Sequence, residues 1–286
     1  MTCKFPKLNI LSAYPYFKQF KPKEIEYIGQ NDINFVLDSG AFTAHQLGKP
    51  IDIKDYINFV KNLPFKPNHV VQLDVIGDAE KSYENYLRML DAGIECLPVF
   101  TRGGTIEQLE RLYSHSDYVL IGGVAFGKDN DRYVDYIMRY IKERKVHWLG
   151  FTSLKYIAKW KPTSVDSSSF LVCPRYGIMT DIYKGCGKIK TITYKEFINN
   201  AEKRKEVMEF INRYNLQITY EQALLKENWI SNNIIFNVTA YTHVLRAIET
   251  EGKWRTKVFH AVSGFSKDIP PLYKAYDNIK KRKEVL

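Results

Sequence analysis

The feature that most constrains the fold is a regular alternation of short apolar segments with amphipathic ones. The apolar segments are typical of strands covered on both faces. There are seven of them, at residues 8–12, 33–37, 69–74, 95–99, 118–122, 146–150 and 163–165. Between them, apolar residues recur at helical spacing, as at Tyr56, Phe59, Val60 and Leu63. Strands that alternate with helices through short connections predict a parallel sheet.

The helices also carry signals for where they begin and end. Asp78 is a candidate N-cap, and Gly93 is a candidate stop for the helix between them. Thr105 and Gln108 form a capping box ahead of the next helix. These signals place short loops between the elements and so support the alternation.

We predict an α/β protein built on a (β/α)8 TIM-type barrel, for which about eight strands are expected. An open doubly wound sheet is the alternative, but no G-x-G-x-x-G motif follows the first strand. From about residue 190 the pattern changes, and residues 194–212, 219–228 and 232–249 have helical patterns. Residues 1–286 are therefore predicted to form a single barrel domain with core motifs in 33–170 and additional helices in about 190–286.

The composition narrows the classes of function. A net charge of +10 favours contact with a polyanion such as a nucleic acid, although a lysine-rich surface without a partner has the same charge. The chain has no run of about eighteen apolar residues and no signal-peptide pattern at its start, so we expect a cytoplasmic protein without a membrane partner. Its four cysteines form no C-x-x-C pair and are interpreted as small buried residues, with no metal or other cofactor predicted.

Acidic residues and glycines stand where the predicted strands end. Asp38, Asp74 and Asp166 each close an apolar strand, and the ends of the strands in a TIM-type barrel meet at the active-site mouth. Each acid alone suits a turn or a helix cap, but three acids at strand ends together indicate a site. The glycines near the same ends allow close backbone approach to a flat ligand; they are Gly40, Gly103, Gly122, Gly123 and Gly150.

This combination suits glycosyl chemistry. One carboxylate attacks or stabilises the anomeric carbon while a second transfers a proton. A third is left to accept hydrogen bonds from the ring N–H and amino groups of a base such as guanine.

The order of the motifs resembles that of the tRNA-guanine transglycosylases. DSGAF at 38–42 is similar to the D-S-G-G-F element of that family, and LDV at 73–75 lies where the family has an acid that reads the base. The further similar stretches are RGG at 102–104, IGGVAFG at 121–127, HWLGFTS at 147–153 and VDSSSF at 165–170. The resemblance covers residues 33–170 and implies a (β/α)8 glycosyltransferase (a pentosyltransferase) that exchanges guanine for a 7-deazaguanine.

Carried over by position, the resemblance implies that Asp166 is the nucleophile and that Asp38 is the acid and base. Asp74 would bind the base edge with help from the backbone amides of Gly122 and Gly123. The further candidates for substrate binding are Ser39, Gly40, Phe42, Gln72, Arg102, Gly103 and Gly150. Phe42 suits either a stacking role or the core, and Gln72 either the base or the far side of its strand. His147 suits either a carboxylate partner or an ordinary interior position.

The chain departs from the tRNA enzymes in lacking their C-x-C-x-x-C zinc subdomain, and Arg102 replaces a family glutamine. In these respects it resembles the compact phage DNA-guanine transglycosylases, which place 7-deazaguanines in phage DNA and so blunt host restriction. The resemblance therefore implies DNA as the acceptor, a 7-deazaguanine such as 7-cyano-7-deazaguanine as the incoming base, and the host cytoplasm as the location. Basic residues after the predicted nucleophile suit the DNA backbone; they are Arg175, Lys184, Lys188 and Lys190.

Three alternatives remain at this stage. The first is a tRNA-guanine transglycosylase without zinc, and the second is a catalytically inactive barrel that binds nucleic acid. The third is a glycosidase that acts on free sugars, which the basic charge favours least. The sequence gives no prediction of the oligomeric state.

Overall fold

The computed structural model describes residues 5–124, 130–180, 191–225 and 234–283. They form two compact units, so that the predicted single domain has two parts. The barrel unit comprises residues 7–167 and 253–265, and the second unit comprises the described parts of 1–6, 168–252 and 266–286. Among the described residues, no helix combines the length and the apolar character that crossing a membrane requires.

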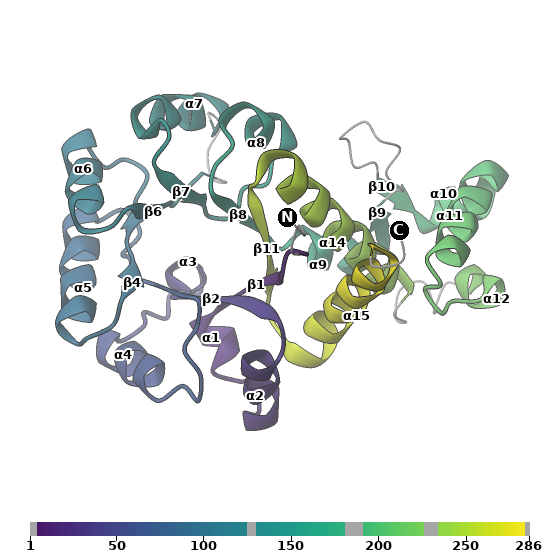
Figure 1. Cartoon of the computed structure of the whole chain (residues 1–286), viewed down its shortest axis with the longest axis horizontal. Helices are drawn as coiled ribbons and strands as arrows, with labels where there is room; N and C mark the ends of the chain where they lie inside the picture. The colour runs from purple at the N-terminus through teal and green to yellow at the C-terminus, as the bar shows by residue number, and fades with distance from the viewer. Residues whose placement is uncertain (1–4, 125–129, 181–190, 226–233, 284–286) are drawn as a thin grey trace. The chain divides into compact units, whose positions relative to one another are not determined.

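The barrel unit is a ring of parallel strands, which Figure 1 shows nearly end-on. The order of the strands in the sheet is β4-β3-β2-β1-β11-β8-β7-β6-β5. Their bounds are β1 Leu8–Ala13, β2 Ile33–Asp38, β3 His69–Val71, β4 Cys96–Leu97, β5 Val99–Phe100, β6 Tyr118–Ile121, β7 Lys145–Trp148, β8 Ser164–Ser167 and β11 Lys257–Val262. The seven predicted strands are all present, and the predicted barrel is confirmed.

The ring is nearly closed because its two terminal strands are consecutive in the chain. Pro98 separates β4 from β5, and a proline has no N–H to give to a ladder. β4 pairs with β3, while β5 pairs with β6, so this one stretch joins the two ends of the sheet. Counting β4 and β5 as one strand gives the eight strands of a TIM-type barrel.

The eighth strand, β11, lies within the segment for which only helices were expected. It pairs with β1 on one side, with Ile10 opposite His260, and with β8 on the other, with Asp166 opposite Phe259. The barrel is thus completed by a strand that follows a long insertion after β8.

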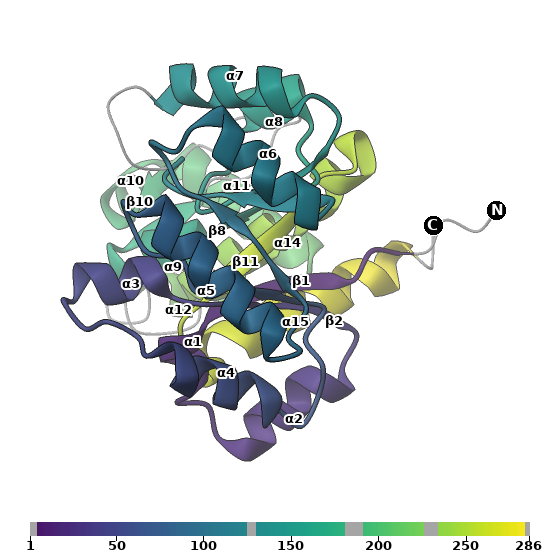
Figure 2. The ribbon, with the colours of Figure 1, turned by 90° about the vertical axis from the view of Figure 1, so that its left-hand side faces the viewer.

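Helices lie around the ring, as Figures 1 and 2 show for the barrel unit, except α3, which Figure 1 draws within the outline of the ring. Their bounds are α1 Tyr14–Phe17, α2 Pro22–Gln30, α3 Ala41–Gln46, α4 Ile53–Lys61, α5 Ala79–Asp91, α6 Ile106–His115, α7 Asn130–Ile141 and α8 Leu154–Trp160. The predicted caps are confirmed: the Asp78 side chain accepts from the N–H of Lys81, and Thr105 and Gln108 form a capping box. Gly93, at φ +77°, follows the end of α5.

One apolar cluster lies on the outer side of the barrel wall and another on its inner side. The outer cluster joins strand residues such as Val119, Ile121 and Trp148 to the inner faces of α6, α7 and α8. The inner cluster contains one buried residue from each of six strands, as expected for side chains that point into a barrel; these are Leu11, Val36, Val71, Val99, Leu120 and Phe259. By the same alternation along the strands, Asp38, His147 and Asp166 also face the inside of the barrel.

The second unit is mostly helical, as predicted, and also contains a small antiparallel sheet that the sequence did not predict. Its elements are α9 Ser169–Arg175, β9 Ile178–Thr180, β10 Thr191–Thr193, α10 Tyr194–Asn199, α11 Ala201–Arg213, α12 Tyr220–Leu224, α14 Ile234–Trp254 and α15 Phe265–Lys283. The predicted helix at 194–212 is divided at Asn200, whose side chain caps α11 by accepting from the N–H of Lys203.

Candidate active site

Asp38 is the last residue of β2, and a tight turn fixes its carboxylate. Gly40 has φ +76°, and its N–H donates to Oδ2 of Asp38 over 2.9 Å. A Cβ on Gly40 would lie 2.3 Å from Cδ of Pro15, which no real side chain tolerates. The turn therefore requires glycine for both its backbone angle and its close approach to Pro15, and α3 begins directly after it.

Asp74 lies three residues beyond the end of β3, not at the strand end as the sequence suggested. Side chains of α5 hold this loop: Ser82 Oγ accepts from the N–H of Val75 over 2.8 Å, and the Asn85 amide donates to the carbonyl of Leu73 over 3.0 Å. The Ser39 hydroxyl, from the turn after β2, donates to Oδ1 of Asp74 over 3.4 Å. Ser39 thus links the second and third strands at the mouth.

Asp166 lies within β8 and is the most buried of the three acids, with 6% of its surface exposed. Two N–H groups meet at its Oδ1: the backbone N–H of Gly150 at 2.7 Å and Nε2 of His147 at 3.0 Å. Gly150 has φ +67°, a backbone conformation that favours glycine and directs its N–H at the carboxylate.

The three acids come together, as the sequence predicted. Burial and the nearby charges of Asp74 and Asp166 together raise the pKa of Asp38 to about 7, against the opposing backbone hydrogen bonds of Gly40 and Ser39. Burial also raises the pKa of Asp74 to about 6 despite its hydrogen bond from Ser39. The mouth therefore holds one acid beside two N–H donors and two acids poised to exchange protons near neutral pH.

Two of the predicted base-binding groups are engaged elsewhere in the fold. The Gln72 side-chain amide donates to the carbonyl of Ser82 in α5 over 3.1 Å, because Val71 faces the barrel interior and the next side chain along the strand faces the outer helices. The N–H of Gly122 donates to the carbonyl of Phe100 over 2.9 Å as part of the sheet. The prediction that the Gly122 amide binds the base edge is therefore wrong for this conformation, and Gln72 does not join the acids.

Arg102 and the glycines near it form a separate arrangement at β5 and β6. The Arg102 guanidinium donates to the carbonyl of Gly123 over 3.2 Å and lies 4.6 Å from the centre of the Tyr133 ring. A Cβ on Gly123 would lie 2.7 Å from Cβ of Arg102, so the two residues pack directly on each other. Gly103 has φ +94° in the turn that follows β5. These contacts link Arg102 with Gly123 and Tyr133.

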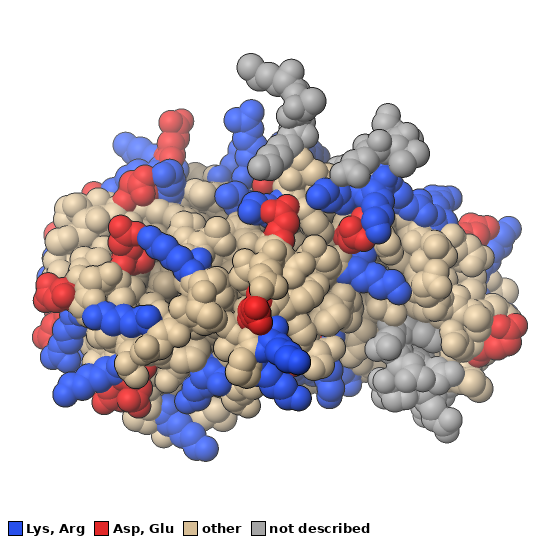
Figure 3. Space-filling model, turned by 60° about the horizontal axis from the view of Figure 1, so that its bottom comes forward, with Lys and Arg blue, Asp and Glu red and all other residues tan. Residues whose placement is uncertain are grey.

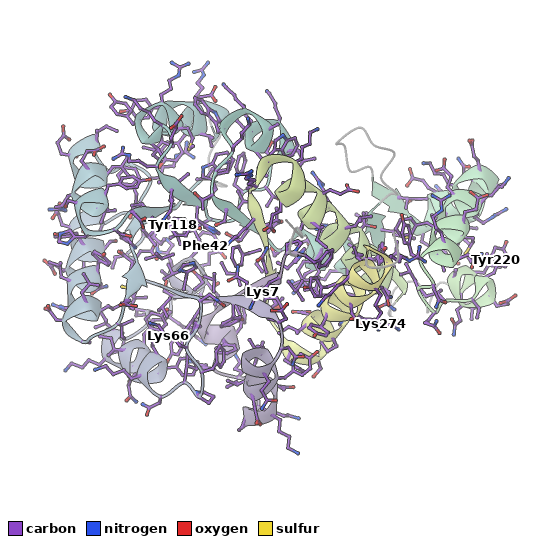
Figure 4. The ribbon with its side chains drawn as sticks, in the orientation of Figure 1. Lys7, Phe42, Lys66, Tyr118, Tyr220 and Lys274 are labelled. Carbon is purple, nitrogen blue, oxygen red and sulfur yellow. The ribbon has the colours of Figure 1, made fainter. Side chains whose placement is uncertain are left out.

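Phe42 is half-buried on α3, and Figure 4 shows its side chain within the ring of strands in that view. This position is consistent with either a stacking role or a packing role. Arg175 is exposed at the end of α9 in the second unit. Lys184, Lys188 and Lys190 lie outside the described residues. On the face drawn in Figure 3, the coloured Lys and Arg side chains are spread among Asp and Glu rather than gathered in one patch.

The sequence left the role of His147 open, and the structure makes it a direct partner of Asp166. The available signal was its position: His147 stands between Val146 and Trp148, which pack outward in the outer cluster, so its own side chain faces inward. No group of three or more potential metal ligands occurs among the residues that the structure describes. Searches of protein-family models, curated proteins and solved structures found no match to this chain.

Proposed function

We propose that the protein is a base-exchange transglycosylase that replaces guanine in DNA with a 7-deazaguanine such as 7-cyano-7-deazaguanine. The observation that carries this proposal is the difference between the carboxylates at one barrel mouth. Asp166 has two N–H donors on one oxygen, and Asp38 has a pKa raised to about 7. A nucleophile and a proton donor need these two environments.

The first half of the reaction uses both residues. An oxygen of Asp166 attacks C1′ of the target nucleotide, and the bond between C1′ and N9 of guanine breaks with its electron pair on the base. Asp38, protonated below its raised pKa, gives its proton to the departing guanine. The products of this half are neutral guanine, the Asp38 carboxylate and a glycosyl ester on Asp166.

The second half reverses these roles. The Asp38 carboxylate removes the proton from N9 of the incoming 7-deazaguanine, and N9 attacks C1′ while the bond to Asp166 breaks. Asp38 is protonated again and Asp166 is a carboxylate again, so the exchange needs no oxidant, metal or nucleotide cofactor. Asp74, oriented by Ser39, accepts hydrogen bonds from the N–H groups of either base.

DNA as the acceptor is supported by the net charge of +10 and by the missing zinc motif. The glycosidic bond of a guanine in a duplex is not accessible to a barrel mouth, so the target nucleotide must be flipped out or presented in a single strand. Modification of this kind in phage DNA would protect it from restriction by the host.

The test is base exchange with labelled guanine. The purified protein is incubated with guanine-containing DNA or with tRNA, each with labelled guanine and with 7-cyano-7-deazaguanine, and the nucleosides are analysed by mass spectrometry. Incorporation into DNA supports the proposal. Incorporation into tRNA alone would make the protein a tRNA-guanine transglycosylase, and exchange that survives both Asp38→Ala and Asp166→Ala would remove these acids from catalysis. Binding of nucleic acid without any exchange would indicate an inactive barrel.

A further inference from the structure

Four polar side chains form a continuous chain through the interior of the barrel. The Tyr118 hydroxyl, from β6, lies 2.5 Å from Oγ of Ser164 in β8. Ser164 Oγ is hydrogen-bonded to Nδ1 of His147 in β7. Nε2 of His147 is bonded to Oδ1 of Asp166, again in β8, over 3.0 Å. The chain therefore crosses three neighbouring strands and ends on the predicted nucleophile.

These four polar side chains lie in a buried environment, where a polar group without a hydrogen-bond partner costs free energy. His147 is 3% exposed and Ser164 is fully buried. The Phe259 ring lies 6.1 Å from the His147 ring, and the His69 ring packs edge-on against Tyr118 at 5.6 Å. Polar groups buried among such neighbours need hydrogen-bond partners. Figure 4 shows Tyr118 within the ring of strands in that view.

With a neutral His147 ring, the chemistry of the groups sets the direction of every hydrogen bond. The carboxylate of Asp166 can only accept, so Nε2 of His147 carries the proton. In the neutral ring Nδ1 is then an acceptor, and Ser164 must donate to it. The Ser164 oxygen in turn accepts from Tyr118, which keeps its proton because burial raises its pKa to about 12. All three donors therefore point toward Asp166, and such chains strengthen one another.

The hydrogen bonds also distinguish the two oxygens of Asp166. His147 and Gly150 both donate to Oδ1. Within the described part of the chain, no hydrogen bond to Oδ2 is found, so its lone pairs remain available.

We propose that His147 is a positioning residue whose tautomer is fixed by Ser164 and Tyr118, so that it holds Oδ1 of Asp166 and leaves Oδ2 as the oxygen that attacks C1′. This inference rests on the proposed function for the attack itself. The hydrogen-bond arrangement from Tyr118 to Asp166 is tested separately from activity.

The first experiment is nuclear magnetic resonance of protein labelled with 15N-histidine, in which the His147 signals are those lost in His147→Gln. We expect a neutral ring with its proton on Nε2, and an Nδ1 resonance that moves in Ser164→Ala. Ser12→Ala is the matched control, because Ser12 is also buried in the barrel but donates to the carbonyl of Val262 over 3.1 Å. A proton on Nδ1, or equal shifts in both serine variants, would overturn the arrangement. This result does not depend on whether the protein exchanges bases.

The second experiment measures kcat and KM for base exchange. His147→Leu removes the donor to Asp166 and should lower kcat by about 10- to 100-fold with little change in KM, since a hydrogen bond to a charged group is lost. His147→Gln keeps an N–H that reaches Asp166 and should recover several-fold of the loss, whereas Ser12→Ala should match the wild type. Tyr118→Phe, which removes one oxygen and keeps the ring, should give a smaller loss in kcat.

Equal losses in the leucine and glutamine variants, or an effect mainly on KM, would contradict a positioning role. A wild-type protein without exchange activity refutes the proposed function and leaves the resonance experiment to decide the arrangement of the chain.

Discussion

On the β7 and β8 side of the barrel mouth, Asp166 lies in a strand and receives N–H groups from His147 and Gly150. On the β2 and β3 side, Asp38 and Asp74 lie at a strand end and in a loop, and their pKa values are raised to about 7 and about 6. On the first side, two N–H donors meet at one oxygen of the acid. On the second side, Asp38 also accepts backbone hydrogen bonds from Gly40 and Ser39, but its burial and the charges of Asp74 and Asp166 outweigh them.

The difference between these two sides shows how one residue type acquires two chemical roles. Donors arranged around a carboxylate favour the charged form, whereas burial and neighbouring acids favour the neutral form. Neighbouring carboxyl groups with contrasting environments are the arrangement that separates an acid from a nucleophile. The roles proposed for Asp166 and Asp38 agree with this contrast, and each prediction below removes one part of it.

The largest effect is expected from Asp166→Asn. The substitution keeps the size of the side chain but removes the attacking oxygen, so base exchange should fall by about 10⁴-fold or more. When the reaction is trapped and analysed by mass spectrometry, the wild type should show a glycosyl adduct on Asp166, and the variant should show none. Asp135→Asn is the control, because Asp135 lies on the barrel's outer surface in an ion pair with Lys159 at 2.8 Å. Exchange by Asp166→Asn at the rate of the control would remove Asp166 from the mechanism.

The next effect concerns proton transfer by Asp38. Asp38→Asn should slow guanine release by about 10²- to 10⁴-fold, the usual contribution of a positioned acid or base. In the wild type, the release step needs protonated Asp38, so its rate should fall as the pH rises through about 7. Rapid-quench measurement of released guanine across this pH range tests the sign. A release rate that increases through the same range would show that Asp38 is not the acid.

A third prediction concerns the turn that supports the second side. Gly40→Ala places a side chain at φ +76° and against Pro15, and should lower the free energy of unfolding by about 2 kcal/mol or more. Gly48→Ala separates the two causes, because Gly48 has φ +61° but open space around its Cβ. Urea unfolding of both variants should show the larger loss for Gly40→Ala. Equal losses would mean that Pro15 yields and that the close approach is unimportant.

The smallest effect is a gain in stability when Asp38, the acid with the raised pKa, is replaced. The folded-state pKa of Asp38, about 7, lies above the ordinary value of 3.8, so folding opposes its ionisation. This cost is absent below about pH 4, increases as the pH rises, and is complete above about pH 7. Asp38→Asn should therefore stabilise the protein relative to the wild type by on the order of 1 kcal/mol near pH 8, with a smaller difference near pH 4. Urea unfolding at both pH values measures this difference, and a variant that loses relative stability between pH 4 and pH 8 would contradict it.

The local sequence pattern was sufficient to predict the barrel and the acids at its mouth. The seven strands, the Asp78 and Thr105 caps and the meeting of the three acids all follow from periodicity and from the rule that parallel strands end at one mouth. β11 was not predicted, and one of its two partners in the sheet, β1, lies near the other end of the chain: Ser12 and Val262 are separated by 250 residues. No local signal reports such a pairing.

The errors at the site have a similar cause. Gln72 was assigned by its motif, but Val71 faces the barrel interior, so the Gln72 side chain faces outward and donates to Ser82 in α5. Gly122 was assigned by motif, yet its N–H belongs to the ladder with Phe100. The chain from Tyr118 to Asp166 depends on side chains of three strands meeting inside the barrel, which a linear pattern does not record.

The late position of β11 has a consequence for how the barrel forms during synthesis. β1 and β8 pair with β11 on either side, so both strands have one unpaired edge until residues 257–262 leave the ribosome. Contacts between residues so distant in sequence form slowly, and exposed strand edges are where chains associate with one another. Between β8 and β11 the chain makes most of the second compact unit. The nascent protein therefore passes through a period with an open sheet, in which a protective chaperone would have its greatest effect on yield.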